Sequence, residues 1–149
     1  FRFPIISENS KILKNFNFEE VQLFNKLKIE KNLFFKSGND KTLKKLYQNA
    51  SLFITTSKNE GFGLTPLEAM SCGCPTICSN IEIFREILGS SCSYINPNDI
   101  NDIKKKIENV VKSKKKQKML IKRGFLIAQK YSWDKCSVET IKIYKKVLN

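Results

Sequence analysis

Two acidic residues, Glu60 and Glu68, flank a segment that contains Gly61 and Gly63. The pattern is E-x7-E, with seven residues between the two glutamates. A carboxylate accepts hydrogen bonds from neighbouring hydroxyl groups, so this pair suits a sugar or a ribose. Glycines lack a Cβ and let the backbone approach a ligand closely. The residue types and their spacing therefore predict a site for a small ligand that carries hydroxyl groups.

The elements around this segment would hold it in place. The apolar run 52–55 is typical of a buried strand, and the run 75–78 predicts a second one. A helix is predicted between them, ending near Gly73. Thr65 can cap its start, and Pro66 suits the first helical position because no amide donor is needed there. The predicted order is strand, glycine-rich loop, helix, strand.

The start of that helix is expected to attract an anion. The first amides of a helix are unpaired, and the helix dipole is positive at that end. We therefore expect the amides of Gly63, Leu64 and Thr65 to bind an anion such as a diphosphate. Glu60 and Glu68 are expected to face the same cavity as this helix start. Taken alone, the pattern fits equally well a solvated Glu60 in a turn and a surface Glu68 on a helix.

Short apolar runs alternate with amphipathic stretches along the rest of the chain. The first ten residues are expected to form the end of a helix and a turn. Further strands are predicted at 12–16, 32–35 and 93–95, and further helices at 18–28, 41–49, 80–88, 100–111 and 133–148 with another after the lysine run 112–118. This alternation predicts an α/β fold, a doubly wound, Rossmann-like parallel sheet that ends in helices.

The composition is that of a folded domain with a strong basic excess. Hydrophobic residues make up 41% of the 149 residues, and no apolar run is long enough to span a membrane. Lys and Arg number 27 against 14 acidic residues, so the net charge is +13. That charge would attract anions, although a Lys-, Asn- and Ile-rich composition is an equally good explanation of it. The alternative function is therefore a basic interaction module that binds nucleic acid or anionic membrane, but it lacks interleaved aromatic residues and any nucleic-acid motif.

The cysteines and the lack of histidine indicate a reducing compartment without a metal site. Five Cys form an odd set, which argues against a closed disulfide framework. No second Cys or His pair stands at zinc spacing from Cys72 and Cys74. We expect reduced thiols and a cytoplasmic location.

The segment EGFGLTPLEAMSCGCPTICSN resembles the E-x7-E region of retaining nucleotide-sugar glycosyltransferases of the GT-B fold, such as O-antigen and capsule mannosyl- and glucosyltransferases. Three further landmarks of that family follow the same order in the chain. They are Leu46-Tyr47-Gln48-Asn49-Ala50-Ser51, Asn96-Pro97-Asn98-Asp99 and Tyr131-Ser132-Trp133-Asp134-Lys135-Cys136. Four ordered landmarks are far more specific than one glycine pattern.

The resemblance implies the donor-binding, C-terminal half of a hexosyltransferase that uses a UDP- or GDP-sugar and neither a metal nor another cofactor. Glu60 would be the catalytic residue that holds the transferred sugar, and Glu68 would hold the ribose. The donor-binding set also includes Gly61, Phe62, Gly63, Leu64 and Thr65, with Gly38 and Asn39 near the base. The acceptor would be a glycan or a lipid-linked glycan, with a peripheral contact to an anionic membrane on its inner face, and no nucleic acid is expected as a partner.

The same resemblance predicts how the chain is divided and what it lacks. Residues 1–130 would be a partial donor domain without its first strand, and 131–149 a helix that crosses to an absent N-terminal domain. The Arg and Lys that relatives place on the diphosphate have no match in residues 1–20. We therefore expect the chain alone to be a fragment without transferase activity. One departure is local, because Phe84 stands where relatives carry a proline.

Overall fold

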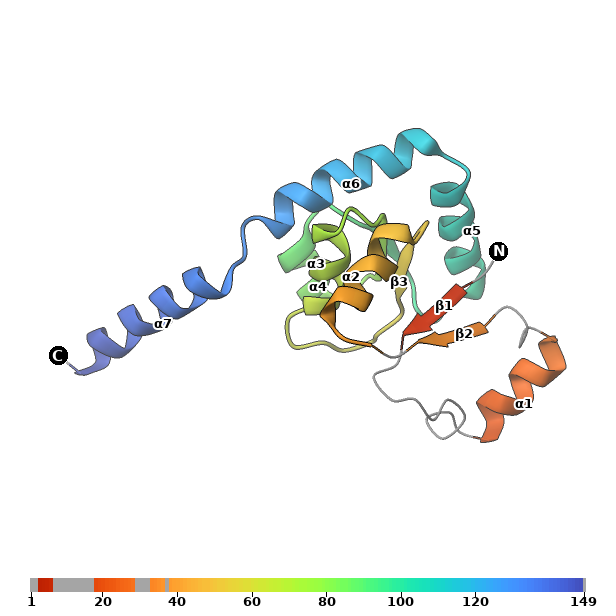
Figure 1. The fold of residues 1–149 in the computed structure, drawn as a ribbon, viewed down its shortest axis with the longest axis horizontal. Helices are drawn as coiled ribbons and strands as arrows, with labels where there is room; N and C mark the ends of the chain where they lie inside the picture. Colours follow the sequence, from red (N-terminus) through yellow and green to blue (C-terminus); the bar gives the residue numbers. More distant parts are fainter. Residues whose placement is uncertain (1–2, 7–17, 29–32, 37, 149) are drawn as a thin grey trace. The chain divides into compact units, whose positions relative to one another are not determined.

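The computed structural model describes residues 3–6, 18–28, 33–36 and 38–148 (Figure 1). Within these residues, five short strands form two parallel sheets. The chain divides into two compact units, Phe1–Leu46 and Tyr47–Asn149. Each unit contains one of the sheets. The division at 130/131 expected from the sequence stays a prediction.

The first unit is built on a pair of parallel strands. β1 (Phe3–Ile6) pairs with β2 (Leu33–Lys36), and α1 (Phe18–Leu27) lies between them in the sequence. The expectation of a helix end and turn at the start of the chain is therefore wrong. Pro4 fixes a φ that extended backbone also adopts, and Pro is tolerated at edge positions of a sheet. The strand expected at 12–16 lies outside the described residues.

The second unit contains a three-stranded parallel sheet in the order β3-β4-β5. β3 (Phe53–Thr55), β4 (Thr76–Ser79) and β5 (Ser93–Ile95) agree with the predicted strands to within one residue. Helix α2 (Asp40–Asn49) precedes β3, and α3 (Leu64–Ser71) and α4 (Glu82–Leu88) connect the strands. The predicted strand–loop–helix–strand order is confirmed.

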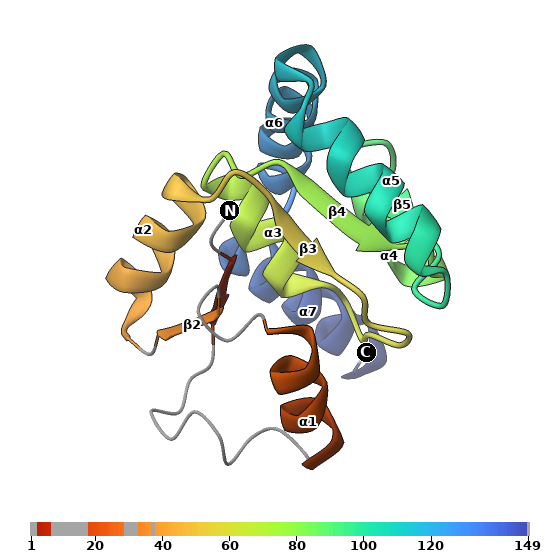
Figure 2. The ribbon, with the colours of Figure 1, turned by 90° about the vertical axis from the view of Figure 1, so that its right-hand side faces the viewer.

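Helices cover both faces of this sheet, as Figure 2 shows from the side. Neighbouring residues of the central strand point to opposite faces, so Cys78 joins one apolar cluster and Ile77 the other. The first cluster also contains Leu67, Met70, Phe84, Ile87, Leu88 and Cys92. The second contains Ile95, Val110 and Leu120, from β5, α5 (Ile100–Val111) and α6 (Lys114–Ala128). The predicted doubly wound, Rossmann-like arrangement is confirmed.

Helix α6 packs closely on α3. A Cβ placed on Gly124 would lie 3.0 Å from Cγ of Met70, so only glycine fits without displacing that side chain. Met70 lines the first core cluster. Gly124 therefore allows the approach of the two helices without ending α6.

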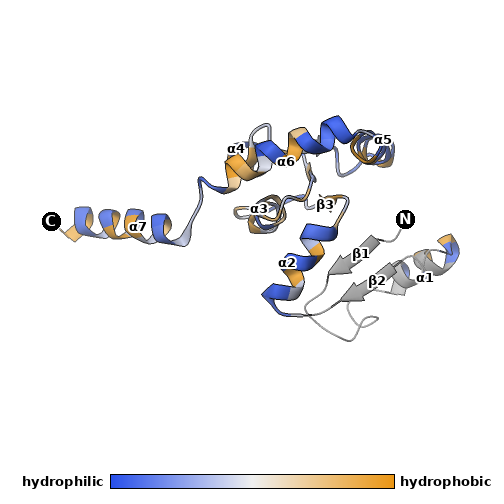
Figure 3. Cartoon of the chain, turned by 45° about the horizontal axis from the view of Figure 1, so that its top comes forward, coloured by the Kyte–Doolittle hydropathy of each residue, from blue (hydrophilic) through white to orange (hydrophobic). Residues whose placement is uncertain are grey.

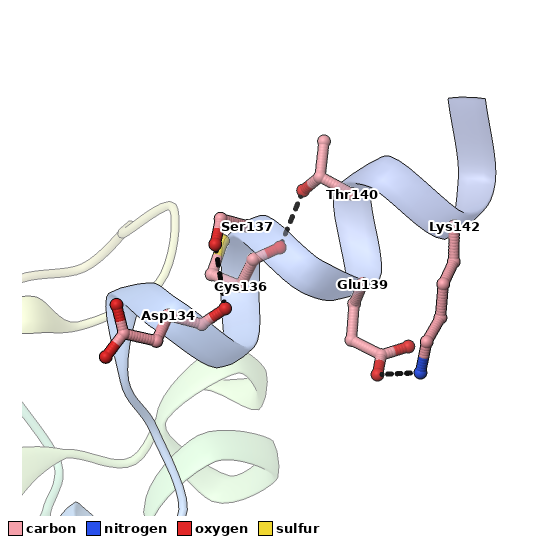
Figure 4. Close-up of polar contacts among 6 residues, drawn as sticks. All are labelled: Asp134, Cys136, Ser137, Glu139, Thr140 and Lys142. Carbon is pink, nitrogen blue, oxygen red and sulfur yellow. Dashed lines mark hydrogen bonds and ion pairs between the residues drawn. The ribbon is translucent and has the colours of Figure 1, made fainter. Parts of the chain in front are cut away.

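The last helix, α7 (Trp133–Leu148), buries none of its residues. Ser132 caps it, since Oγ of Ser132 accepts a hydrogen bond from the amide of Lys135 at 3.1 Å. The contacts drawn in Figure 4 all join residues within α7, including an ion pair of 2.8 Å between Lys142 and Glu139. Within the described residues, no helix is both long enough and apolar enough to cross a bilayer.

Candidate functional site

Helix α3 begins at a glycine in the left-handed region. Gly63 is the N-cap residue, with φ 99° and ψ 46°, and no side chain caps the helix. The expectation that Thr65 would cap α3 is therefore wrong, and Pro66 is the third helical residue instead of the first. A left-handed N-cap fits glycine, which has no Cβ to clash in that conformation. The helix start is left without the side-chain oxygen that a Ser, Thr or Asp cap would supply.

This uncapped start leaves backbone donors available. Among the described residues, the amides of Gly63, Leu64 and Thr65 donate to no other backbone group. Pro66 has no amide hydrogen, and the amide of Leu67 donates to the carbonyl oxygen of Gly63 at 3.4 Å. Leu64 and Thr65 are exposed. Gly63 is buried. The first turn therefore has three amides without a backbone partner in the described part of the chain, at the positive end of the helix dipole, two of them on exposed residues.

The buried side chain of Phe84 packs against Gly63, the residue that begins α3. The Phe84 side chain is fully buried, and a Cβ built on Gly63 would lie 2.9 Å from its Cε1 atom. The ring thus occupies the space that any other residue at position 63 would need. Phe84 stands where relatives carry a proline, and in this structure its ring packs against Gly63 at the start of α3.

Glu68 lies in the second turn of α3 and has one polar partner. The hydroxyl of Tyr47 donates a hydrogen bond of 3.5 Å to Oε2 of Glu68. Burial and the nearby Glu68 carboxylate raise the pKa of Tyr47 to about 12, so its hydroxyl stays protonated and remains a donor at neutral pH. The Tyr47 ring meets Phe53 of β3 edge-on, with 5.8 Å between ring centroids. Tyr47 therefore connects Glu68 to the sheet.

The two glutamates line different cavities. Glu60 lies in the wall of a cavity of about 350 Å³, together with Lys58, Asn59 and the start of α4 at Ile81, Glu82, Ile83 and Glu86. Glu68 lies in the wall of a second cavity of about 720 Å³, together with Phe62, Leu64, Leu67 and Ser71 and, from residues 128–139, Ala128, Lys130, Tyr131, Ser132, Trp133, Lys135, Cys136 and Glu139. The expectation that both carboxylates face one cavity is therefore wrong. Of the segment between them, Phe62 lines the cavity of Glu68.

An aromatic contact fixes one side of this segment. The rings of Phe62 and Tyr131 meet edge-on with 5.4 Å between their centroids. The Tyr131 hydroxyl in turn donates a hydrogen bond of 3.3 Å to the carbonyl oxygen of Ile87 in α4. The glycine-rich loop is therefore attached, through Tyr131, to the linker between α6 and α7.

Gly38 and Asn39 belong to the first unit and have local contacts there. Oδ1 of Asn39 accepts hydrogen bonds from the amide and the hydroxyl of Thr42, at 3.2 and 3.3 Å, at the start of α2. A Cβ on Gly38 would lie 2.6 Å from Cβ of Thr42. Both residues thus shape the start of a helix, and their contact with a nucleotide base stays a prediction.

Three residues of the site were missed as functional candidates. Tyr47 and Tyr131 lie in the segments 46–51 and 131–136 that resemble the family. Their place in those segments was the one indication in the sequence that they could belong to the site. Phe84 was noted only as a departure. No three Asp, Glu, Cys or His side chains converge as metal ligands would, within the part of the chain that the structure describes.

The fold and the site define a Rossmann-like α/β domain with an open helix start, and comparisons with known proteins identify its family. The model of the family described as "Glycosyl transferases group 1" matches residues 14–126. The chain therefore belongs to the group 1 glycosyl transferases.

Two curated relatives of the chain are mannosyltransferases by their names. An O-antigen chain mannosyltransferase B from Escherichia coli is 38% identical over 106 residues, which cover 71% of this chain and 28% of that protein. A GDP-mannose:cellobiosyl-diphosphopolyprenol alpha-mannosyltransferase from Komagataeibacter xylinus is 32% identical over 124 residues, or 80% of this chain and 32% of that protein. The chain thus spans about a third or less of these relatives.

Solved structures confirm the GT-B fold. A glycosyltransferase from Rickettsia africae superposes with a TM-score of 0.83 at 19% identity, over 100% of this chain and 40% of that one. The sucrose-phosphate synthase of Thermosynechococcus elongatus gives 0.81 at 18% identity, over 97% of this chain and 38% of the other. An Anabaena protein solved in complex with UDP and glucose also gives 0.81 at 17% identity, over 96% and 40%.

Proposed function

We propose that the chain is the donor-binding, C-terminal half of a retaining glycosyltransferase. The whole protein would move a mannose- or glucose-type hexose from a nucleotide diphosphate sugar to a hydroxyl of a glycan or lipid-linked glycan. The observation that carries this assignment is the uncapped start of α3, whose amides lie in sequence between two carboxylates that line separate cavities.

Separate cavities suit a ligand with three parts. A nucleotide sugar has a diphosphate in its middle and a hydroxyl-bearing ring at each end. The amides of Gly63, Leu64 and Thr65 would bind the diphosphate, Glu68 the ribose on one side, and Glu60 the transferred sugar on the other. Gly61 and Phe62 would shape the loop between them. Gly38 and Asn39 would lie near the base.

The chemical step needs stabilisation of charge on the leaving group. As the bond to the diphosphate breaks, negative charge grows on its oxygen and the sugar becomes oxocarbenium-like. Fixed amides and a helix dipole aimed at that oxygen lower the barrier because they need no reorganisation. In this proposal, these backbone groups stabilise the diphosphate without a metal ion.

The names of relatives support the choice of substrates. GDP-mannose and a diphosphopolyprenol acceptor appear in the name of one relative, and UDP and glucose in the description of one structural neighbour. All five cysteines are free thiols, which is compatible with the proposed cytoplasmic location. A lipid-linked acceptor would bring the protein to the inner face of a membrane.

Calorimetric titration of the 149-residue chain with GDP-mannose and with UDP-glucose tests this function. We expect weak binding of at least one donor, because residues 1–20 contain no match for the Arg and Lys that contact the diphosphate in relatives. We also expect that Glu68→Ala abolishes this binding. We expect no transferase activity from the chain alone. Lack of binding by either donor, or unchanged binding in Glu68→Ala, would contradict the assignment.

A further inference from the structure

The solvent-facing side of α6 is basic and has no acidic neighbours in the sequence. Every charged residue between Glu108 and Asp134 is a Lys or an Arg. Four lysines of α6 are exposed, and three of them, Lys115, Lys118 and Lys122, lie on one side of the helix. The helix therefore concentrates positive charge on one surface.

These lysines are not neutralised within the protein. The two ion pairs found among the described residues join Lys112 to Glu108 and Lys142 to Glu139, and neither uses a residue of α6. Lys118 and Lys122 also make no side-chain hydrogen bond in that part of the chain. Their charge is therefore available to an external anion.

Two apolar side chains lie among these lysines. Met119 is 39% exposed and Leu126 is 58% exposed. The spacing 115, 119, 122 and 126 follows one side of a helix, opposite the buried Leu120 and Gly124. Figure 3 shows the resulting alternation of hydrophilic and hydrophobic turns along α6.

We propose that this outer face of α6, formed by Lys115, Lys118, Met119, Lys122 and Leu126, docks on an anionic lipid surface. Lysines near such a surface gain electrostatic attraction within a Debye length, and apolar side chains between them can enter the interfacial region. This docking is independent of the donor site.

The surface suits lipid better than nucleic acid. Single-stranded nucleic acid is bound by exposed aromatic platforms combined with a basic groove. α6 carries one aromatic residue, Phe125, which is 41% exposed. The edge of its ring lies against Gly73, where an added Cβ would be 3.1 Å from its Cζ atom, so a single ring held at its edge takes the place of a series of stacking platforms. The face is a helix surface whose interleaved side chains are aliphatic, which is the pattern of an interfacial helix.

Co-sedimentation of the 149-residue chain with vesicles tests the docking. The vesicles contain phosphatidylcholine alone or an equal mixture of phosphatidylcholine and phosphatidylglycerol. We expect binding to the mixed vesicles only. Lys118→Gln/Lys122→Gln should lower the partition coefficient roughly 25-fold, at about fivefold per lysine. Met119→Ser/Leu126→Ser should weaken the binding that persists at high salt.

A matched pair on α7 separates this face from net charge. Lys145→Gln/Lys146→Gln removes the same charge and should change binding by less than about twofold. Unchanged circular dichroism would show that the exposed substitutions leave the fold intact, and Glu68→Ala should bind vesicles normally. Equal losses for the two lysine pairs, binding to neutral vesicles, or tighter binding to random duplex DNA at the same salt would overturn the proposal.

Discussion

The ring of Phe84 fills the space where a side chain at Gly63 would begin. The ring edge lies 2.9 Å from the position of a Cβ at residue 63, and φ of Gly63 is 99°. A core residue of α4 therefore fixes the backbone that begins α3. The amides proposed to bind the diphosphate are those of Gly63 and the next two residues. The packing of Phe84 on Gly63 therefore positions the proposed binding site as well.

Gly63→Ala should destabilise the protein. The left-handed backbone alone costs an alanine about 1–2 kcal/mol, and the contact with Phe84 adds to this. Urea unfolding followed by circular dichroism would measure the change. Gly61→Ala is the matched control, because no atom lies within 4 Å of a Cβ there, and it should change stability by less than about 0.5 kcal/mol. Equal effects of the two substitutions would contradict the packing described.

The effects of changing Gly63 and Phe84 should not be additive. Phe84→Leu removes ring atoms and should cost roughly 1–3 kcal/mol as a single substitution, because the side chain is fully buried. In the double variant Gly63→Ala/Phe84→Leu, the leucine relieves the contact that the new methyl group makes with the ring, so we expect a coupling free energy of about 1 kcal/mol. A double-mutant cycle by urea unfolding measures it, and strict additivity would show that the two residues do not interact.

Stability should fall at alkaline pH. Burial, followed by the proximity of Cys72, raises the pKa of the Cys74 thiol from its ordinary value of 9.0 to about 12. Between these two values the unfolded chain has lost a proton that the folded protein keeps. Stability is therefore full below about pH 9 and falls with rising pH by at most about 1.4 kcal/mol per pH unit for this group, and Tyr47 adds a similar loss between about pH 10 and 12.

Unfolding titrations of the wild type and Cys74→Ala across this range would measure the effect. The variant should have a shallower decrease between about pH 9 and 10, where Tyr47 does not yet contribute. An identical decrease in both proteins would rule out the buried thiol as its cause.

Tyr47→Phe should separate binding from stability. The lost hydrogen bond is 3.5 Å long and its acceptor, Glu68, is exposed, so the free energy of unfolding should change by about 1 kcal/mol or less. If Glu68 holds the ribose, loss of this positioning contact should weaken nucleotide affinity by roughly threefold to tenfold. Tyr144→Phe on the exposed α7 is the control. Unchanged affinity in Tyr47→Phe would mean that Tyr47 does not position Glu68 for binding.

The sequence was most informative where local chemistry decides the structure. Asp99 caps α5 by accepting hydrogen bonds from the amides of Asn101 and Asp102 at 2.9 and 3.2 Å, and α5 begins where the sequence predicted a helix. Ser132 caps α7 for the same local reason. The strands at 53–55, 76–79 and 93–95 were predicted from apolar runs because both of their faces are covered.

Other features depend on contacts between distant residues. The cap at α3 could not be predicted, because Phe84 is 21 positions away from Gly63 in the sequence and yet determines which residue fits there. The Tyr47–Glu68 hydrogen bond joins α2 to α3. The strand at 3–6 was missed because its pairing with β2 is long-range and its run is short. The two-cavity arrangement likewise depends on how α4 and the 128–139 segment pack.

Amide NMR of the isotope-labelled chain, titrated with a nucleotide sugar, tests the central claim most directly. If the start of α3 binds the diphosphate, the largest shift changes should fall on the amides of Gly63, Leu64 and Thr65, and they should disappear in Glu68→Ala. Shift changes confined to other parts of the chain, or no change at these three amides at saturating donor, would contradict the assignment of a nucleotide-sugar site to this helix.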